Sequence, residues 1–331
     1  MAKILITGAS GFIGNHVTRL CLEKGDDVRV MVMPGEDRSP FTGLDVEFVE
    51  GNLLDPASLT KAVAGIEQLY HMAALFAVWT KDPDLHYKIN VDGTRAIMEA
   101  AQQAGVEKIV YTSSVAAIGV NPDRTPATEK TAFNCWPWAS EYILSKFISH
   151  QLVKGMVAQG LPATMVLPAL PFGPGDRAPT PTGSLMVRIL KGEMKNYWDG
   201  GVCPVDVRDV AAGHLLAMEK GRIGESYLLG NSDTNMTNRE FLQLVAKVTG
   251  VPNVAVKEIP GKVMLTASRF IEGWSKLSGR PASTTYKNTL FVLQHCYIDP
   301  TKAVTELGLP QTPIEKAIID SAEWFRANGY V

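Results

Sequence analysis

Lys3-Ile-Leu-Ile-Thr-Gly-Ala-Ser-Gly-Phe-Ile-Gly14 opens the chain and determines its fold class more than any other segment. A short apolar run that ends at glycine is typical of a buried parallel strand. An apolar periodic stretch, residues 13–22, follows the glycines and predicts a helix. Strand, glycine turn and helix together bring the amides of a helix N-terminus to a pyrophosphate. The spacing is G-x-x-G-x-x-G, which can also be a simple tight turn, but its place at the first βα junction favours the nucleotide.

Composition limits the class of protein. The 331 residues are 46% hydrophobic and 20% charged, enough for a large core, and the net charge of -2 gives no reason to expect nucleic acid as a partner. Four scattered cysteines lack metal-ligand spacing, so we expect no metal site and a reducing compartment. No secretory signal and no membrane span are recognisable, which predicts a cytoplasmic protein.

Strand and helix patterns alternate along the first half of the chain, which predicts an α/β fold of the Rossmann type, a doubly wound parallel sheet. We expect a nucleotide-binding domain over residues 1–168, with residues 203–230 returning to its sheet, and a smaller C-terminal substrate-binding lobe from residues 169–202 and 231–331. The expected strands are residues 3–7, 27–33, 46–50, 68–71, 108–111, 163–167 and 205–207, and residues 84–104 are expected to form one long helix.

Tyr142 and Lys146 are spaced to lie on one face of a helix, about one turn apart. An ammonium beside a phenol favours the phenolate, so the lysine is expected to lower the tyrosine pKa and make it an acid or base near neutral pH. The alternative is that the two residues have no catalytic role and lie on an ordinary, partly solvated helix face. The glycine turn and the run Thr112-Ser113-Ser114 after a strand favour the catalytic interpretation.

The tip of the second strand bears on cofactor choice. Dinucleotide enzymes place there an acid for ribose hydroxyls or a basic residue for a 2′-phosphate. No acid stands at the tip itself, and Glu36, Asp37, Arg38 and Ser39 follow in the loop. Arg38 and Ser39 could hold a 2′-phosphate, while the acidic Glu36 and Asp37 beside them work against it. A solvated arginine is an equally good interpretation, but the pattern favours NADP(H), with NAD(H) as the alternative.

Taken in order, the motifs resemble the extended short-chain dehydrogenase/reductase family along nearly the whole chain. Within it the chain looks most like dihydroflavonol 4-reductase-like reductases and hopanoid-associated sugar epimerase-like proteins. The matching segments are residues 7–14, Gly-Asn-Leu-Leu-Asp (51–55), His-Met-Ala-Ala (71–74), Asn-Val-Asp-Gly-Thr (90–94), Tyr-Thr-Ser-Ser (111–114), Tyr142 with Lys146, Gly-Pro-Gly-Asp (173–176) and Val-Asp-Val-Arg-Asp-Val-Ala (205–211).

The resemblance implies that Tyr142 protonates a carbonyl oxygen, that Ser114 holds this oxygen, and that Lys146 binds the nicotinamide ribose. It implies that the cofactor-binding residues are Gly8, Ser10, Gly11, Phe12, Ile13, Gly14, Met33, Arg38, Asn52, Leu53, Ala73, Ala74, Asn90, Thr112, Tyr142, Lys146, Pro168 and Leu170. The chain departs from relatives at Met33, where reductases often have arginine, and at His150, where many nucleotide-sugar enzymes have glutamate. Val115-Ala116 replaces the acidic pair of dehydratases, so dehydration is not expected.

The first functional hypothesis is an NAD(P)H-dependent reductase of an apolar or aromatic ketone or aldehyde. A sugar epimerase and a non-catalytic nucleotide sensor are the alternatives, and a homodimer is possible. Loop aromatics that would line a pocket, or simply pack, are Phe76, Trp79, Trp136, Trp138, Tyr197 and Trp198.

One further pattern is an apolar helical stripe of Val263, Ala267, Phe270, Trp274 and Leu277. Burial within the lobe or at a dimer contact is the preferred interpretation, ahead of a membrane-facing surface.

Overall fold

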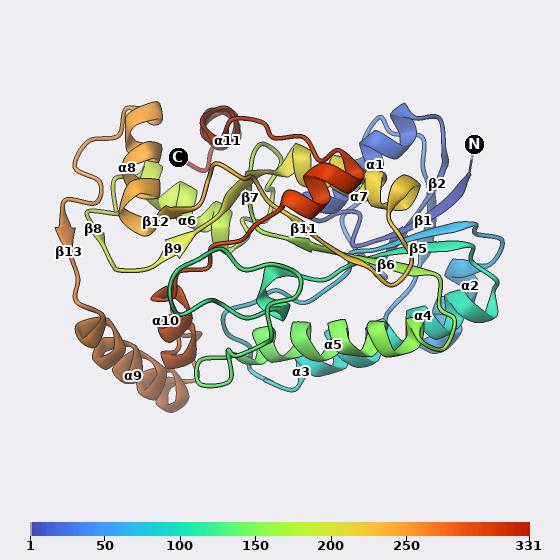
Figure 1. The fold of residues 1–331 in the computed structure, drawn as a ribbon, viewed down its shortest axis with the longest axis horizontal. Helices are drawn as coiled ribbons and strands as arrows, with labels where there is room; N and C mark the ends of the chain where they lie inside the picture. The colour runs from blue at the N-terminus through green and yellow to red at the C-terminus, as the bar shows by residue number, and fades with distance from the viewer. Residues whose placement is uncertain (1) are drawn as a thin grey trace.

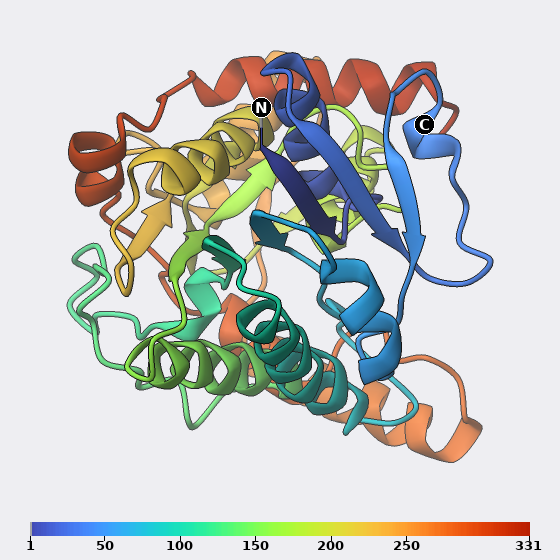
Figure 2. The ribbon, with the colours of Figure 1, turned by 90° about the vertical axis from the view of Figure 1, so that its right-hand side faces the viewer.

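The computed structural model describes residues 2–331, and its centre is a seven-stranded, fully parallel sheet (Figures 1 and 2). The strand order is β11-β6-β5-β4-β1-β2-β3, which confirms the Rossmann-type prediction. The order reverses between β1 and β4, so the carboxyl ends of these strands flank the crevice where such sheets bind ligands. The strands are β1 (Lys3–Thr7), β2 (Asp27–Val32), β3 (Glu47–Glu50), β4 (Gln68–His71), β5 (Lys108–Thr112), β6 (Ala163–Pro168) and β11 (Ser226–Leu229).

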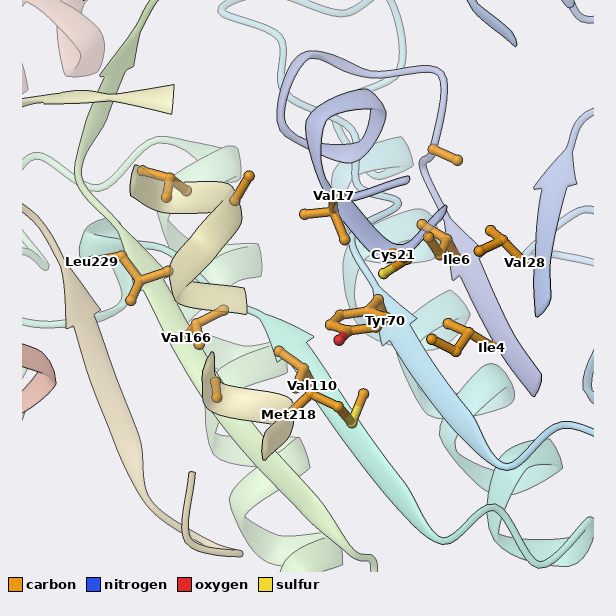
Figure 3. Packing of buried hydrophobic residues seen from close by; sticks show 14 of the residues in the cluster. Ile4, Ile6, Val17, Cys21, Val28, Tyr70, Val110, Val166, Met218 and Leu229 are labelled. Carbon is orange, nitrogen blue, oxygen red and sulfur yellow. The ribbon is translucent and has the colours of Figure 1, made fainter. Parts of the chain in front are cut away.

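Helices cover both faces of the sheet (Figure 2). On one face lie α1 (Phe12–Glu23) and α7 (Val207–Lys220), and on the other lie α2 (Pro56–Val63), α4 (Thr94–Gln103) and α5 (Glu141–Val157). Successive strand residues point to opposite faces, so β1 gives Ile4 and Ile6 to one core and Leu5 to the other. Figure 3 shows the first of these cores, in which Val17 of α1 and Met218 of α7 pack toward the sheet. β1, which leads into the glycine turn, is therefore packed on both faces.

The region after β6 forms a lobe with its own core. It is built on α6 (Pro181–Leu190), α8 (Asn238–Thr249) and α11 (Ile314–Ala327). The expected return of residues 203–230 is met by α7 and β11, but residues 205–207 do not join the main sheet. Instead β10 (Pro204–Asp206) pairs in parallel with β7 (Leu170–Phe172) in a separate ribbon. These placements support the division that we propose near residue 168.

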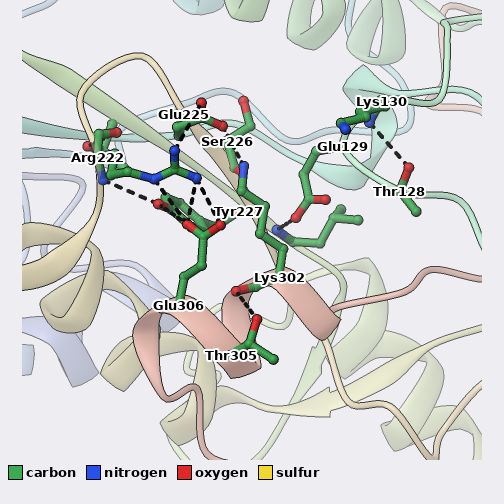
Figure 4. Close-up of polar contacts among 12 residues, drawn as sticks. Thr128, Glu129, Lys130, Arg222, Glu225, Ser226, Tyr227, Lys302, Thr305 and Glu306 are labelled. Carbon is green, nitrogen blue, oxygen red and sulfur yellow. Dashed lines mark hydrogen bonds and ion pairs between the residues drawn. The ribbon is translucent and has the colours of Figure 1, made fainter.

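A polar cluster ties this lobe to the main layers. The Asp206 carboxylate is fully buried, caps α7 through the Arg208 amide and accepts from the Arg208 guanidinium. The same guanidinium reaches Asp320 of α11 at 2.6 Å. A second contact is made at the edge of the sheet, where Lys302 donates to the Ser226 carbonyl oxygen at 2.7 Å (Figure 4). The motif at residues 205–211 is therefore structural in this chain.

Shorter elements complete the chain. Two small ribbons pair β8 (Asn196–Tyr197) with β13 (Lys257–Glu258) and β9 (Gly201–Val202) with β12 (Met236–Thr237). The remaining helices and turns are η1 (Ser39–Phe41), α3 (Leu85–Tyr87), η2 (Lys88–Gly93), η3 (Val115–Ala117), α9 (Gly261–Ser278), α10 (Tyr286–Val292) and η4 (Ala303–Leu307).

The helix expected over residues 84–104 is interrupted. Residues 88–93 form a π-helical turn, η2, between α3 and α4. Such single wide turns are often found at functional sites. Here the turn contains Asn90, whose side chain enters the site described below.

The apolar stripe on α9 is not buried within the lobe, so this part of the preferred expectation is wrong, whereas burial at a dimer contact stays a prediction. Val263, Phe270, Trp274 and Leu277 are 56%, 75%, 65% and 81% exposed. Figure 1 shows α9 at the end of the molecule away from the edge strands β2 and β3. Within residues 2–331, no helix combines the length and the apolar character needed to cross a bilayer.

Candidate active site

The glycine turn between β1 and α1 packs directly against the end of β4. Gly8 has φ +72°, and a Cβ on it would lie 2.7 Å from the Ala73 amide nitrogen. A Cβ on Gly14 would lie 2.1 Å from the Gly8 carbonyl oxygen, so this glycine is required by the protein's own packing. Gly11 differs, because its Cβ would meet only the Gly8 oxygen, at 3.2 Å. Of the two glycines expected to make space for a pyrophosphate, only Gly11 therefore borders open space.

The helix N-terminus beside this turn fits an anionic group. α1 begins at Phe12 with no side-chain cap and no acid in its first turn. The amides of a first helical turn, here Phe12, Ile13 and Gly14, have no partners within the helix and attract a phosphate. The turn is held from below by Thr7, whose hydroxyl accepts from the Ala73 amide and contacts His71 at 2.8 Å. Burial lowers the pKa of His71 to about 3, so this histidine is neutral and structural.

Lys146 is held at the carboxyl end of β5. Its ammonium group donates to the Thr112 carbonyl oxygen at 2.8 Å and lies 5.2 Å from the centre of the Tyr111 ring. The Thr112 hydroxyl is turned to the other side of the strand, where it bonds His214 at 2.9 Å. Burial lowers the pKa of Lys146 to about 7. An ammonium has three hydrogens, so two remain for a ligand.

Tyr142 lies one turn before Lys146 on α5, with the ring of Phe76 only 4.6 Å away, centre to centre. Burial raises the pKa of Tyr142 to about 12, and a side-chain hydrogen bond with Ser114 opposes this only in part. The expectation that Lys146 lowers the tyrosine pKa is therefore not met. The reason is that the lysine is turned to Thr112 and is itself readily neutralised, while desolvation of the phenol disfavours its charged form.

Ser114 is positioned as the N-cap of η3, directly after β5. Its hydroxyl oxygen accepts from the Ala116 amide at 3.1 Å. The cap fixes the side chain, and the Tyr142 phenol lies near enough for Ser114 to oppose the rise in the tyrosine pKa. The three residues expected to be catalytic thus converge at one edge of the sheet.

Asn90 is occupied by the protein and has no side-chain group directed to a cofactor. Its amide group exchanges hydrogen bonds with the main chain of Leu75, at 2.7 and 3.1 Å, and donates to the Ser145 hydroxyl at 2.9 Å. Ser145 in turn donates to the Tyr142 carbonyl oxygen. Asn90 therefore connects the loop that carries Phe76 to the turn of α5 that carries Tyr142.

Glu36, which the sequence reasoning placed in the loop, lies at the tip of β2. The Glu36 carboxylate accepts from the Met33 amide at 2.7 Å and from the Ser10 hydroxyl in the glycine turn. The signal was present in Pro34-Gly35, because proline and a glycine with φ +77° at the two central positions specify a type II turn. That turn closes with the Glu36 amide bonded to the Met33 carbonyl oxygen at 3.0 Å, so it returns Glu36 to the strand end.

Arg38 and Ser39, the proposed 2′-phosphate ligands, are engaged elsewhere. Arg38 pairs with Glu50 at 3.1 Å and lies over the Phe48 ring at 4.8 Å, beside β3. The Ser39 amide donates to Asp37 at 2.9 Å. Neither side chain is directed to the glycine turn by a contact of its own.

The other cofactor-binding candidates lie around the crevice and differ in burial and in hydrogen bonding. Asn52 accepts from the Leu54 amide at 2.9 Å, and Leu53 is 8% exposed and packs against Gly93. Any contact of Leu53 with a ligand would therefore come from its main chain. Ala74 is exposed after β4, while Pro168 ends β6 and Leu170 begins β7.

The predicted aromatic pocket is only partly assembled. Phe76 contacts Tyr142, and Trp138 lines a cavity of about 270 Å³ together with Asp199 and Leu293. Trp136 instead packs on Phe133 and Phe147, on another face of α5. Tyr197 and Trp198 pack in the lobe core, and the Trp198 indole donates to the Val292 carbonyl oxygen. Trp79 lies half-buried in the loop after Phe76.

His150, the departure noted in the sequence, is a packing residue on this side of the sheet. It bonds the Ser113 hydroxyl at 3.0 Å, and burial lowers its pKa to about 4. It therefore supplies no charge to the site at neutral pH.

Comparison with known proteins agrees with this geometry. The model of the NAD dependent epimerase/dehydratase family matches residues 4–230. A protein of Synechocystis sp. with the provisional name dihydroflavonol 4-reductase is 37% identical over 98% of this chain and 95% of its own length. Sterol demethylase protein B of Methylococcus capsulatus is 32% identical over 99% of both chains. Among solved structures, the chain in the crystal structure of gox2253 is 37% identical in sequence, and the match covers 100% of both chains. The two structures superpose with a TM-score of 0.89. The chain therefore belongs to the NAD-dependent epimerase/dehydratase family, the extended short-chain dehydrogenases/reductases.

Proposed function

We propose that the protein reduces a ketone or aldehyde to an alcohol with a reduced nicotinamide dinucleotide, and that Tyr142 donates the proton. The observation that carries this proposal is the half-buried phenol of Tyr142, packed against Phe76 and near Ser114 at the carboxyl end of β5. With its pKa raised to about 12, the phenol keeps its proton at neutral pH and is ready to act as an acid.

In this proposal each residue has a defined task. Ser114, fixed by its capping bond, donates a hydrogen bond to the substrate oxygen. Tyr142 passes its proton to that oxygen as negative charge develops there, and Lys146 holds the nicotinamide ribose while it remains anchored on Thr112. The bound cofactor supplies the hydride, and the protein supplies orientation and the proton.

The surroundings of the phenol support an apolar or aromatic substrate. The Phe76 side chain is 47% exposed although its ring lies against Tyr142, so it offers an apolar surface at the reacting group. The relative named for sterol demethylation is consistent with a substrate of this kind.

The epimerase alternative requires the tyrosine to begin by accepting a proton from a hydroxyl group. A phenol with a raised pKa is poorly prepared for this step in the free protein. A nucleotide sensor would not need Ser114 and Tyr142 in contact. Both alternatives are therefore less well supported than the reductase.

For the finer question of cofactor, the tip of β2 supports NAD(H) rather than the NADP(H) expected from the sequence. The Glu36 carboxylate, bonded to Ser10 and Met33, lies beside the glycine turn, where it can accept from ribose hydroxyls and repel a 2′-phosphate. Arg38, the expected phosphate ligand, is already paired with Glu50.

The test is a panel of apolar and aromatic ketones and aldehydes incubated with the purified protein and NADH or NADPH. A reductase consumes one reduced cofactor for each alcohol formed, with NADH the better donor. An epimerase leaves the added cofactor unchanged while it converts a sugar, and that result with no carbonyl reduced would overturn the proposal.

A further inference from the structure

Helix α9 presents an apolar surface to solvent that the active site does not explain. Val263, Phe270 and Leu277 recur every seven residues, and Trp274 lies one turn beyond Phe270, so all four side chains share one face. Their exposed fractions range from 56% to 81%. A row of large exposed apolar residues of this kind marks an interaction surface rather than ordinary scatter.

A row of cations runs beside the apolar row. Lys262, Arg269 and Lys276 also recur every seven residues, and each comes one position before an apolar residue of the row. All three residues are exposed. The cations therefore follow one flank of the apolar face along the whole helix.

Positive charge exceeds negative charge in the segment that contains α9. The one acid on α9 is Glu272, which is half-buried, accepts from the Tyr286 amide at 3.0 Å and pairs with Lys276. Residues 257–287 contain six Lys and Arg but two Glu, a net charge of +4, whereas the whole chain carries -2. The positive charge is thus concentrated around α9.

We propose that α9 docks the protein on an anionic lipid surface, with the apolar row inserted at the headgroup boundary and the cations on lipid phosphates. Trp, Phe and Leu on one face with Lys and Arg beside them are the composition of helices that lie in a membrane interface. Lys and Arg can extend their charged ends to the headgroups while their stems cover apolar surface. Because no helix among the described residues can span a bilayer, α9 would lie on the membrane plane.

A second copy of the chain is a poorer occupant. In an antiparallel twofold contact through α9, the two cation rows would lie on the same side of the interface. The one carboxylate on the helix, Glu272, already pairs with Lys276 of its own chain, so α9 offers no further carboxylate to Lys262 and Arg269. Anionic phosphates provide the complementary charge that a second α9 lacks.

The position of α9 relative to the active site gives the docking a consequence. α9 packs on α10, and Lys287 of α10 pairs at 3.7 Å with Glu141, the residue before Tyr142. Phe291 of α10 packs on the same buried cluster as Tyr142. Docking would therefore hold the Tyr142 end of α5 close to the lipid, which suits a membrane-dissolved apolar carbonyl. This consequence rests on the proposed reductase function, whereas the docking itself does not.

The test is co-sedimentation of the full chain with vesicles of phosphatidylcholine alone or mixed with phosphatidylglycerol. We expect binding to the mixed vesicles, weakened by added salt, and a blue shift of fluorescence that Trp274→Phe removes. Phe270→Ser with Leu277→Ser should lower the partition coefficient on the order of tenfold or more, and Lys262→Glu with Lys276→Glu should do the same. The matched controls are Ile223→Ser, which alters an exposed apolar residue elsewhere, and Lys81→Glu with Lys191→Glu.

Three results would overturn the proposal: no binding to either vesicle, control variants that lose as much binding as the α9 variants, or equal binding to neutral vesicles. Sedimentation velocity without lipid measures whether a second copy of the chain binds to this face instead. A dimer that Phe270→Ser with Leu277→Ser dissociates, together with no vesicle binding, would assign this face to a second copy. Because these readouts require no turnover, failure of the docking and failure of the proposed reductase are distinguishable.

Discussion

The Lys146 ammonium group lies 2.8 Å from the carbonyl oxygen of Thr112, the last residue of β5. This bond places the lysine at the end of the sheet and orients it away from a simple side-by-side pairing with Tyr142. Because the lysine is buried without a carboxylate partner, its pKa falls to about 7. Its charge therefore responds to pH and to an anionic ligand.

This relationship predicts that dinucleotide binding takes up a proton above neutral pH. A negative cofactor favours the ammonium form, so the lysine pKa rises on binding, and between its free and bound values one proton is absorbed. Below the free value of about 7 the lysine is already charged, and uptake should vanish. Calorimetry at pH 8 in buffers of different ionisation enthalpy measures the uptake. Lys146→Met should show none, and equal uptake in wild type and variant would remove Lys146 from this role.

For Glu36 we predict that NADH binds more tightly than NADPH and that Glu36→Gln raises the affinity for NADPH. Removing an anion beside the 2′-phosphate should change the ratio of the two dissociation constants on the order of tenfold or more. Fluorescence titration with both cofactors gives this ratio. Arg38→Ala is the matched control and should leave the ratio nearly unchanged, because Arg38 is paired with Glu50. A wild type that prefers NADPH, with the preference lost in Arg38→Ala, would restore the view taken from the sequence.

The two glycines of the turn should separate folding from binding. Gly14→Ala introduces a Cβ at 2.1 Å from the Gly8 carbonyl oxygen, so we expect a loss of unfolding free energy of about 1–3 kcal/mol or more. Gly11→Ala meets only one atom, at 3.2 Å, and should fold nearly normally but bind dinucleotide more weakly. Chemical denaturation and cofactor titration of both variants decide the matter. Equal loss of stability in the two would contradict the difference seen in the turn.

Asn90→Ala should destabilise the protein by about 1–3 kcal/mol, because it leaves half-buried main-chain groups of Leu75 without partners. Asn121 is a suitable control: its side chain also makes two hydrogen bonds to the backbone, here to two carbonyl oxygens in an exposed loop. Asn121→Ala should therefore cost much less. Urea denaturation compares the two, and similar values for both variants would argue against a positioning role for Asn90.

The sequence was sufficient to predict the sheet and the convergence of Ser114, Tyr142 and Lys146, because these depend on local pattern and on the placement of strand ends. It was insufficient wherever a side chain is redirected by tertiary contacts. Lys146 was expected to lower the pKa of Tyr142. Instead, the lysine donates to the Thr112 carbonyl oxygen, and burial raises the tyrosine pKa. Glu36 was assigned to the loop beside Arg38, because the type II turn that returns it to the strand end was not recognised.

The sequence was also insufficient to predict where amphipathic segments pack. The stripe on α9 has the periodicity of a core helix, and periodicity alone does not tell which surface covers it. Residues 205–207 were expected to return to the main sheet, yet β10 (Pro204–Asp206) pairs with β7 outside that sheet, and Val207 already begins α7.

The central claim is that Tyr142 donates the proton in carbonyl reduction, and Tyr142→Phe tests it most directly. With a substrate found in the carbonyl panel, the rate of NADH consumption per alcohol formed is compared for both proteins at saturating cofactor. The account predicts a rate lower by about 10²–10⁴, with the cofactor dissociation constant and unfolding free energy little changed. A folded, cofactor-binding Tyr142→Phe variant that keeps more than about a tenth of the wild-type rate would contradict it.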